Sequence, residues 1–277
     1  MQTASVMSGA PFPRQCVVQV FAAGGDKRHD GLSEDCRAVI EAIKATTSIP
    51  IVLVDVPEFK NSLHMAAYDV TKEDLVVGNM PFCKSALRCL GLRVPLPVDY
   101  PSCLTSYLHR RVWRSTLAQL HALPDSRDKS VFIKPAADGK AFSGLIASED
   151  WLNFLIQEVS PSCEIWCSDC VEMTSECRVY VCDGKILALC MYKATADDAL
   201  LDRRIIEEAV ATLCASPEGI HWSAFAADFA VMHLPSGEVV TGLVEVNEAF
   251  ALGRYDGLAP TDYVKLLATR WKQLMAL

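Results

Sequence analysis

Three oxygen-bearing side chains in the C-terminal part of the chain have the types and spacing of a magnesium site. Glu245 and Asn247 lie two residues apart in the apolar stretch LVEVN, and Asp228 lies in the apolar stretch before it. Side chains two apart on a strand share a face, and a hairpin can bring the two stretches side by side. Mg²⁺ prefers such hard oxygen ligands, completed by phosphate oxygens. The alternative is a solvated sheet face with scattered acids.

Two lysines in a second predicted hairpin have the chemistry of phosphate ligands. Lys134 lies inside the apolar stretch VFIKPA, and Lys140 opens KAFSGLIA after a glycine. A lysine in an apolar strand must find a partner or point into a cleft, because burying an unpaired ammonium is costly. Both could then bind phosphate as point charges. The alternative is a surface hairpin whose lysines extend into solvent.

A further cation lies between the two hairpins. Glu176 and Arg178 are two residues apart in a predicted strand and therefore share a face. Arg178 could reach phosphate oxygens, or it could form a cross-strand ion pair with a carboxylate. The residues alone leave both interpretations open.

The chain contains 12 cysteines, and the densest group raises the question of zinc. Cys167 and Cys170 have the C-x-x-C spacing of zinc ligands, with Cys163 and Cys177 nearby. The surrounding sequence EIWCSDCVEM, however, predicts a strand, and no second C-x-x-C pair follows. We therefore expect buried thiols that behave as small apolar side chains.

The elements that must position these residues fall into two groups. Before residue 98, apolar runs alternate with helical periodicity, which predicts a small parallel α/β unit at 1–98. Hairpins and helices predict an α+β unit at 99–277. The proline-rich stretch 93–102 is interpreted as a linker, and residues 103–123 have the apolar spacing of one helix.

Composition excludes several classes of protein. The net charge of −8 offers no basic surface for a nucleic-acid partner. No apolar run approaches the roughly 18 residues of a membrane span, so we expect no membrane partner. The first residues lack the apolar core of a secretory signal. Together with the cysteine content, this predicts a reduced, cytoplasmic protein.

The order of these features resembles the ATP-grasp superfamily. The stretches FIKPAADGKAFSG and LVEVNEAFALGRYDGL are its most specific parts. They are similar to a divergent clade that includes the cell-division-cycle translation regulators and small bacterial and viral relatives. The resemblance implies an α+β ATP-grasp fold, in which two subdomains at about 128–170 and 171–277 hold ATP between them. It also implies that the preceding α/β unit is a pre-ATP-grasp domain.

The resemblance implies a role for each candidate residue. Mg²⁺ would be held by Asp228, Glu245 and Asn247. The ATP phosphates would be bound by Lys134, Lys140 and Arg178, the last two also acting in catalysis. The hinge strand would meet adenine through backbone groups of Cys167, Ser168, Asp169, Cys170 and Val171. Most superfamily members carry another nucleotide-binding lysine upstream, and here Arg111 or Lys140 could replace it.

The resemblance also implies a reaction. ATP-grasp enzymes typically activate a carboxylate as an acylphosphate that an amine or similar nucleophile attacks. This chemistry needs charge neutralisation and in-line positioning rather than a covalent protein nucleophile. We therefore expect a ligase that uses ATP and Mg²⁺ on a small-molecule, peptide or protein substrate. The alternative is an ATP-binding assembly factor with little turnover, because eukaryotic members of the clade act in assembling a translation initiation factor.

Overall fold

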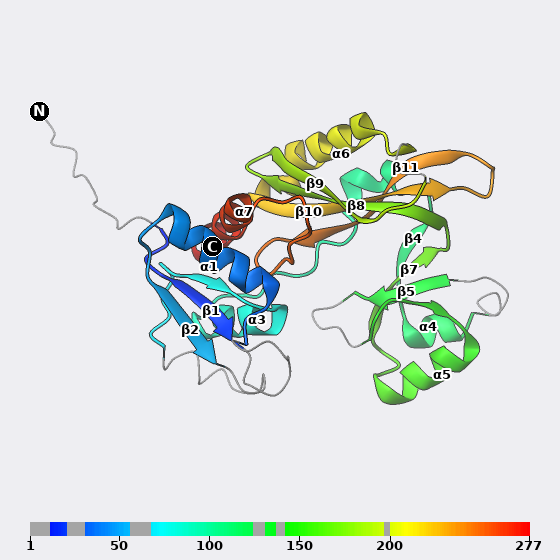
Figure 1. Cartoon of the computed structure of the whole chain (residues 1–277). Coiled ribbons are helices and arrows are strands. Elements are labelled where there is room, and N and C mark those ends of the chain that lie inside the picture. Colours follow the sequence, from blue (N-terminus) through cyan, green and yellow to red (C-terminus); the bar gives the residue numbers. More distant parts are fainter. Residues whose placement is uncertain (1–11, 21–30, 56–67, 124–130, 137–141, 197–199) are drawn as a thin grey trace, which may run out of the picture.

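The computed structural model describes residues 12–20, 31–55, 68–123, 131–136, 142–196 and 200–277. Within these residues the chain forms three β-sheets, each covered by helices (Figure 1). None of the described helices combines the length and apolar character needed to cross a lipid bilayer.

The N-terminal sheet is small and parallel. Its strands, in spatial order, are β2 (Ile51–Asp55), β1 (Cys16–Val20) and β3 (Leu75–Val77). The accompanying helices are α1 (Glu34–Thr46) and α3 (Met80–Cys89). The parallel α/β arrangement predicted for this part of the chain is therefore present.

Capping side chains determine where these two helices begin. The Ser33 hydroxyl accepts a hydrogen bond from the backbone of Cys36, and the Asn79 side chain accepts one from Phe82. Such caps satisfy backbone donors that have no partner within the helix. The cap of α3 follows β3 directly, which places the start of this helix at the carboxyl edge of the parallel sheet.

The second sheet is antiparallel and forms a separate lobe. Its strands, in spatial order, are β4 (Val112–Thr116), β7 (Glu164–Asp169), β5 (Val131–Pro135) and β6 (Leu145–Ala147). Its helices are α4 (Leu117–His121) and α5 (Glu149–Glu158). Leu117 and Leu152 from these helices pack with Ile133 and Ile165 of the sheet in one apolar core.

The third sheet is antiparallel and larger. Its strands, in spatial order, are β11 (Val239–Glu248), β10 (Ala224–His233), β8 (Glu172–Cys182) and β9 (Lys185–Lys193). Helix α6 (Arg203–Ala215) covers one face, with Ile206 and Leu213 packed against Val179 and Phe229.

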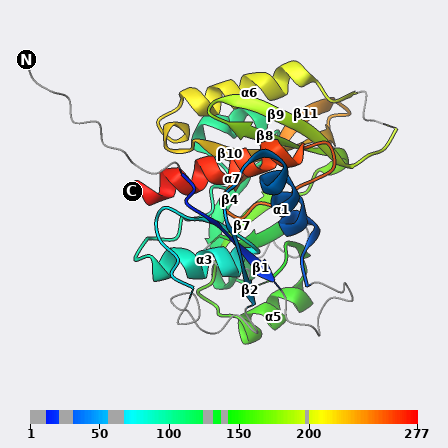
Figure 2. The ribbon, with the colours of Figure 1, turned by 60° about the vertical axis from the view of Figure 1, so that its left-hand side comes forward.

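Helix α7 (Pro260–Met275) joins the third sheet to the N-terminal unit. It contacts α1 and β3 on one side and β8 and β10 on the other. Figure 2 shows α1 and α7 side by side, as Figure 1 does. Trp271 and Leu266 of α7 share a single apolar core with Val76 and Tyr180. The N-terminal unit is therefore packed on the third sheet rather than merely tethered to it.

The structure corrects the prediction of one helix over residues 103–123. This stretch forms a 3₁₀ turn (Ser102–Tyr107), then β4, then α4. Val112, Trp113 and Thr116 are β-branched or aromatic residues that favour a strand. Thr116 then starts α4 with a capping box that includes Gln119. Apolar spacing did not distinguish these short elements from one helix.

The predicted strand over residues 164–173 is also divided. β7 ends at Asp169 and β8 begins at Glu172, in a different sheet. Cys170 and Val171 thus form the short connection between the second and third sheets. Of the predicted strand KAFSGLIA, the described residues contain only the three of β6 in strand conformation.

Candidate functional site

A β-bulge sets the orientation of the acidic residues on β11. Asp228 lies opposite Glu245 and Phe229 lies opposite Leu243, so Val244 is an extra residue on β11. A bulge of this kind shifts the alternation of side chains by one position. The strand therefore has one phase before Val244 and the opposite phase after it.

The bulge sends the polar side chains to one face of the sheet and the apolar ones to the other. Leu243 and Val246 both pack in the core beneath α6, although three positions separate them. Glu245 and Asn247 consequently face the opposite side. Arg110 supports the bulge by donating to the carbonyls of Leu243 at 2.7 Å and Val244 at 2.8 Å.

The three residues predicted to bind magnesium lie together. The Asn247 amide nitrogen is 3.2 Å from Asp228 Oδ2 and 3.1 Å from Glu245 Oε1. Rotation of that amide by half a turn would present its oxygen instead, since the two ends have the same shape. Two carboxylates and an amide so close together fit the ligand preferences of Mg²⁺.

Each carboxylate of this set already has a cationic partner. Arg178 is the cross-strand neighbour of Asp228 and donates to both of its oxygens at 2.7 Å. Lys134 Nζ lies 2.6 Å from Glu245 Oε2 and thereby connects β5 of the second sheet to β11 of the third. Of the two predicted alternatives for Arg178, the cross-strand ion pair is the one present in this nucleotide-free chain.

The electrostatic surroundings of these groups differ. Burial alone would lower the pKa of Lys134, but Glu245 and Asp99 raise it above its ordinary value. Burial would raise the pKa of Glu245, yet Lys134 and Asn247 leave it below its usual range. For Asp228, burial raises the pKa and Arg178 only partly opposes the shift. Asp228 is therefore the carboxylate whose negative charge is least compensated.

Asp99 is a site residue that the sequence analysis did not identify. It lies in the predicted linker, yet its Oδ1 is 2.6 Å from Lys134 Nζ and its Oδ2 accepts from Trp166 Nε1 at 3.0 Å. A single acid in a proline-rich stretch has no spacing pattern that indicates a site. Only the tertiary pairing with β5 and β7 reveals its position.

An aromatic layer borders the arginine. The Arg178 guanidinium lies 4.9 Å from the ring centre of Tyr255, which is stacked on Tyr192 at 4.9 Å. The Tyr180 hydroxyl holds the loop of Tyr255, accepting from its backbone N–H and donating to the Gly253 carbonyl, both at 2.9 Å. The loop after β11 is thereby fixed beside the charged residues.

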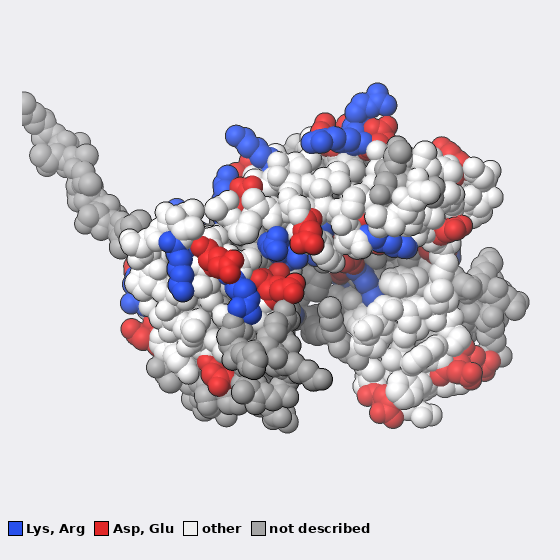
Figure 3. Space-filling view, viewed as in Figure 1, with Lys and Arg blue, Asp and Glu red and all other residues white. Residues whose placement is uncertain are grey.

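A cavity of about 390 Å³ opens beside Lys134, Glu245 and Asn247. Its volume lies within the usual range of small-molecule sites, roughly 300–1,000 Å³. All three structural units contribute to its wall: Met80 and Lys84 from α3, Pro95 and Pro97 from the linker, Phe132, Phe142, Ser143 and Gly144 around β5 and β6, and Phe250 after β11. Figure 3 shows the surface hollowed between the N-terminal unit and the lobe of α5, with charged side chains of both signs inside.

The predicted adenine-binding residues lie away from this cavity. Cys167 and Ser168 are buried, and Asp169 pairs with Arg111 at the surface. Cys170 is exposed in the connection between the sheets, directly before Val171. Their role in adenine binding remains a prediction.

The two candidates for the missing upstream lysine are placed as follows. The Arg111 guanidinium stacks over Trp113 at 4.2 Å, and its side chain is 67% exposed. Its neighbour Arg110 points inward and donates to Ser168 Oγ at 3.0 Å, in addition to the bulge carbonyls. Lys140 lies outside the described residues, so its predicted role is not tested.

No group of three or more histidine, cysteine, aspartate and glutamate side chains within the described ranges is placed to hold a metal ion. The proposed magnesium set contains two carboxylates and therefore depends on the amide of Asn247. Cys167 is buried, whereas Cys170 is exposed, and neither cysteine takes part in a disulfide. The expectation that the cysteines bind no structural metal stays a prediction.

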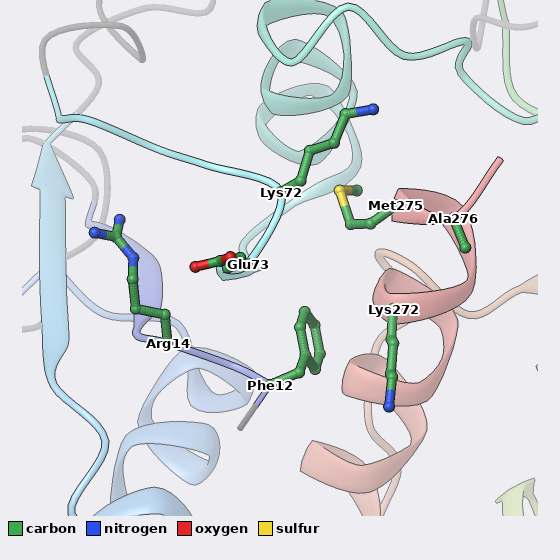
Figure 4. Close-up of a pocket in the computed structure, with 7 residues that line it drawn as sticks. All are labelled: Phe12, Arg14, Lys72, Glu73, Lys272, Met275 and Ala276. Atoms are coloured by element: carbon green, nitrogen blue, oxygen red, sulfur yellow. The ribbon is translucent and has the colours of Figure 1, made fainter. Parts of the chain in front are cut away.

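A second cavity, of about 220 Å³, lies between the N-terminal unit and the end of α7 (Figure 4). Its lining comprises Phe12, Arg14, Lys72, Glu73, Lys272, Met275 and Ala276. The Lys72 and Lys272 ammonium groups point away from each other in Figure 4, and Arg14 is held by Asp74. Because its charged groups do not converge, this cavity is a weaker candidate than the first.

Comparison with known proteins gives a family match and a set of similar folds. Residues 107–266 match a family model that describes an ATP-grasp domain, family 2 of its clade. A search of curated protein sequences gave no significant match.

Among solved structures, D-cycloserine synthetase has a TM-score of 0.55 at 13% identity, covering 92% of this chain and 99% of that one. D-alanine–D-alanine ligase from Bacillus anthracis has a TM-score of 0.53 at 17% identity, with coverages of 95% and 97%. N5-carboxyaminoimidazole synthetase from Staphylococcus aureus has a TM-score of 0.58 at 9% identity, with coverages of 94% and 78%. At these identities the likeness concerns the fold.

Proposed function

Since the chain belongs to this clade family of ATP-grasp domains, we propose that it joins a carboxylate to an amine or similar nucleophile through an acylphosphate. The family match confirms the superfamily and the α+β fold predicted from the sequence. ATP and Mg²⁺, the predicted cofactors, are those of ATP-grasp enzymes. The fold is that of ATP-dependent ligases; the carboxylate–amine reaction is our proposal.

One observation carries the proposal most directly. Arg178, Asp228, Asn247, Glu245 and Lys134 form a continuous chain of charge-assisted contacts beside a cavity of ligand size. Oxygen ligands and cations alternate along this chain. Such an arrangement suits a triphosphate with its metal ion, because it offers both metal ligands and phosphate-binding cations.

The residues would divide the work as follows. Asp228, Glu245 and Asn247 would hold Mg²⁺, which supplies charge neutralisation at the phosphate oxygens when bound. Lys134 and Arg178 are within contact of the same carboxylates, so they can turn from these partners to phosphate oxygens. They would then provide fixed positive charge where negative charge develops during transfer.

The cavity supports a substrate that enters between the N-terminal unit and β11. The proposed substrate is a small molecule, a peptide or a protein that presents a carboxylate near Lys134. The loop after β11, with Tyr255 beside Arg178, would form one wall of the acceptor site. Cys167 to Val171 in the connection between the sheets would meet adenine.

The activity can be tested by measuring ADP release with a panel of amino acids and peptides. A ligase will release ADP only when a carboxylate and a nucleophile are both supplied. Tight ATP binding without release for any member of the panel would instead favour the assembly-factor alternative.

The metal assignment has its own test by calorimetry. Glu245→Ala and Asn247→Ala should each weaken Mg²⁺-dependent ADP binding by about tenfold or more, because each removes one ligand. Glu207→Ala is a suitable control, since Glu207 pairs with Arg203 on the exposed side of α6. Unchanged affinity in both site variants would remove the metal assignment.

A further inference from the structure

We propose that Asp99 is a positioning residue, which keeps Lys134 at the phosphate site when Glu245 is engaged with metal. This inference rests on the proposed function, because it assigns Glu245 to Mg²⁺ and Lys134 to phosphate. It adds a residue from outside the family match, which begins at residue 107.

The backbone of Asp99 is held in an unusual conformation. Its φ angle is +49°, in the left-handed region that few non-glycine residues adopt. Its N–H donates to the Val246 carbonyl at 3.0 Å, and its carbonyl accepts from Val246 N–H at 2.8 Å. The linker thus pairs with β11 at a single residue. Conformations of this kind cost free energy and concentrate at functional sites.

The side chain of Asp99 is divided between two donors. One oxygen is 2.6 Å from Lys134 Nζ and the other accepts from Trp166 at 3.0 Å, with only 13% of the side chain exposed. Tyr100 completes the surroundings, since its ring lies 4.7 Å from Lys134 Nζ and edge-on to Trp166 at 5.0 Å. Lys134 is therefore enclosed by a carboxylate and a ring from the linker, and by Glu245.

The two carboxylates around Lys134 have different further contacts. Glu245 is hydrogen-bonded to Asn247 and so belongs to the proposed metal set. The contacts of Asp99 in the described structure go to Lys134 and Trp166, away from that set. A dication held by Glu245 would repel the nearby ammonium. Asp99 then provides the attraction that keeps Lys134 in place.

This role makes a prediction that a purely structural role does not. Without metal, Lys134 retains Glu245 as a partner, so loss of the Asp99 charge should leave ADP binding unchanged or slightly tighter. With Mg²⁺, the same loss should weaken binding. A residue that only pins the linker to β11 would change both affinities by the same factor.

The experiment is calorimetry of ADP binding to the full chain in excess Mg²⁺ and in EDTA. The key variant is Asp99→Asn, because asparagine tolerates the left-handed region and retains an oxygen for Trp166. The ratio of the EDTA dissociation constant to the Mg²⁺ dissociation constant should fall by about tenfold, the effect of losing a charge-assisted contact. Trp166→Phe should reduce the ratio less, in the same direction.

The matched control is Glu164→Gln. Glu164 pairs at 3.5 Å with Arg114, which stacks on the same Trp166, but it lies at the exposed start of β7. Its ratio should equal that of the unsubstituted chain. Asp99→Gly, which removes the charge and suits the backbone angle, serves as a second variant if Asp99→Asn folds poorly.

The outcomes separate the two levels of the proposal. An unchanged ratio in Asp99→Asn, or an equal loss in Mg²⁺ and EDTA, would overturn the role of Asp99 and leave the proposed function standing. Absence of Mg²⁺-dependent ADP binding in the unsubstituted chain would overturn the proposed function, and the role of Asp99 with it.

Discussion

Asp74 and Asp228 are both buried carboxylates that meet an arginine through two hydrogen bonds. Asp74 is bound by Arg14 at 2.9 and 3.0 Å, and Asp228 by Arg178 at 2.7 Å twice. Both are nearly inaccessible, with 0% and 3% of their surface exposed. Pair geometry alone does not distinguish them.

Their further neighbours differ. Asp74 also accepts from the Thr71 backbone at 2.7 Å, from the Thr71 hydroxyl and from Gln15. Burial would raise the pKa of Asp74, but these donors and Arg14 bring it below its ordinary value. Asp74 therefore has the surroundings of a carboxylate that holds a fold together.

Asp228 has carboxylates among its neighbours instead. Burial raises its pKa, Arg178 opposes the shift, and the negative charges of Glu245 and Glu176 add to it. Uncompensated negative charge in a buried place is unfavourable for folding, but it is what a dication requires. Comparing the two aspartates teaches that donors mark a structural carboxylate, and unneutralised like charges mark a ligand site.

The largest expected effect concerns Asp74. Asp74→Ala should lower the free energy of unfolding by about 2–3 kcal/mol, because buried donors lose their acceptor. Urea denaturation would measure this, with Glu41→Ala on the exposed side of α1 as the control. A loss no greater than that of the control would break the comparison at its structural end.

Lys134 should show its main effect on ligand binding. Lys134→Ala should weaken ATP binding by about tenfold to a hundredfold, through loss of a charge-assisted contact of about 1.5–3 kcal/mol. Lys140→Ala should spare more of the binding and mainly slow a single turnover, if its contact tightens at the transition state. Lys185→Ala, at the exposed start of β9, is the control. Equal losses of affinity in both site variants, with unchanged rates, would contradict this division.

Asp228 should behave as the reverse of Asp74. Asp228→Asn should reduce Mg²⁺-dependent ADP affinity by about tenfold while changing the free energy of unfolding by less than about 1 kcal/mol. The amide preserves an acceptor for Arg178 and removes a poorly compensated charge. Calorimetry and urea denaturation of the same sample would give both numbers. A stability loss as large as that of Asp74→Ala would place Asp228 with the structural carboxylates.

The smallest expected effect is a pH dependence. The pKa of Asp74 is lower in the folded chain, so its contribution to stability is present above the ordinary aspartate pKa of about 4. That contribution is lost as the pH falls through the folded value. The stability deficit of Asp74→Asn should therefore be largest near neutrality and shrink in acid. A deficit that stays constant from pH 7 to pH 3 would contradict the lowered pKa.

The sequence predicted the parts of the molecule that depend on local pattern. Spacing of two placed Glu245 and Asn247 on one face, and the hairpin brought Asp228 beside them. The parallel N-terminal unit followed from alternating apolar runs. These features are encoded within short windows, where periodicity is informative.

The missing parts depend on contacts between distant segments. Asp99 and Lys134 are 35 positions apart, and no local pattern links them. The bulge at Val244 needs Arg110, which lies 134 positions earlier. The strand β4 was taken for helix because its few apolar residues satisfy either period. Tertiary pairing decided each of these cases.

The bulge at Val244 also has a consequence for how this part of the chain can change in length. A deletion within a strand ordinarily rotates every later side chain to the other face. Here the extra residue is Val244 itself, so its removal would leave Leu243 and Val246 in the core and Glu245 and Asn247 outside it. Deleting Val246 instead would turn Asn247 inward. Along β11, Val244 is thus the position where shortening the protein is milder than elsewhere, at the cost of one acceptor for Arg110.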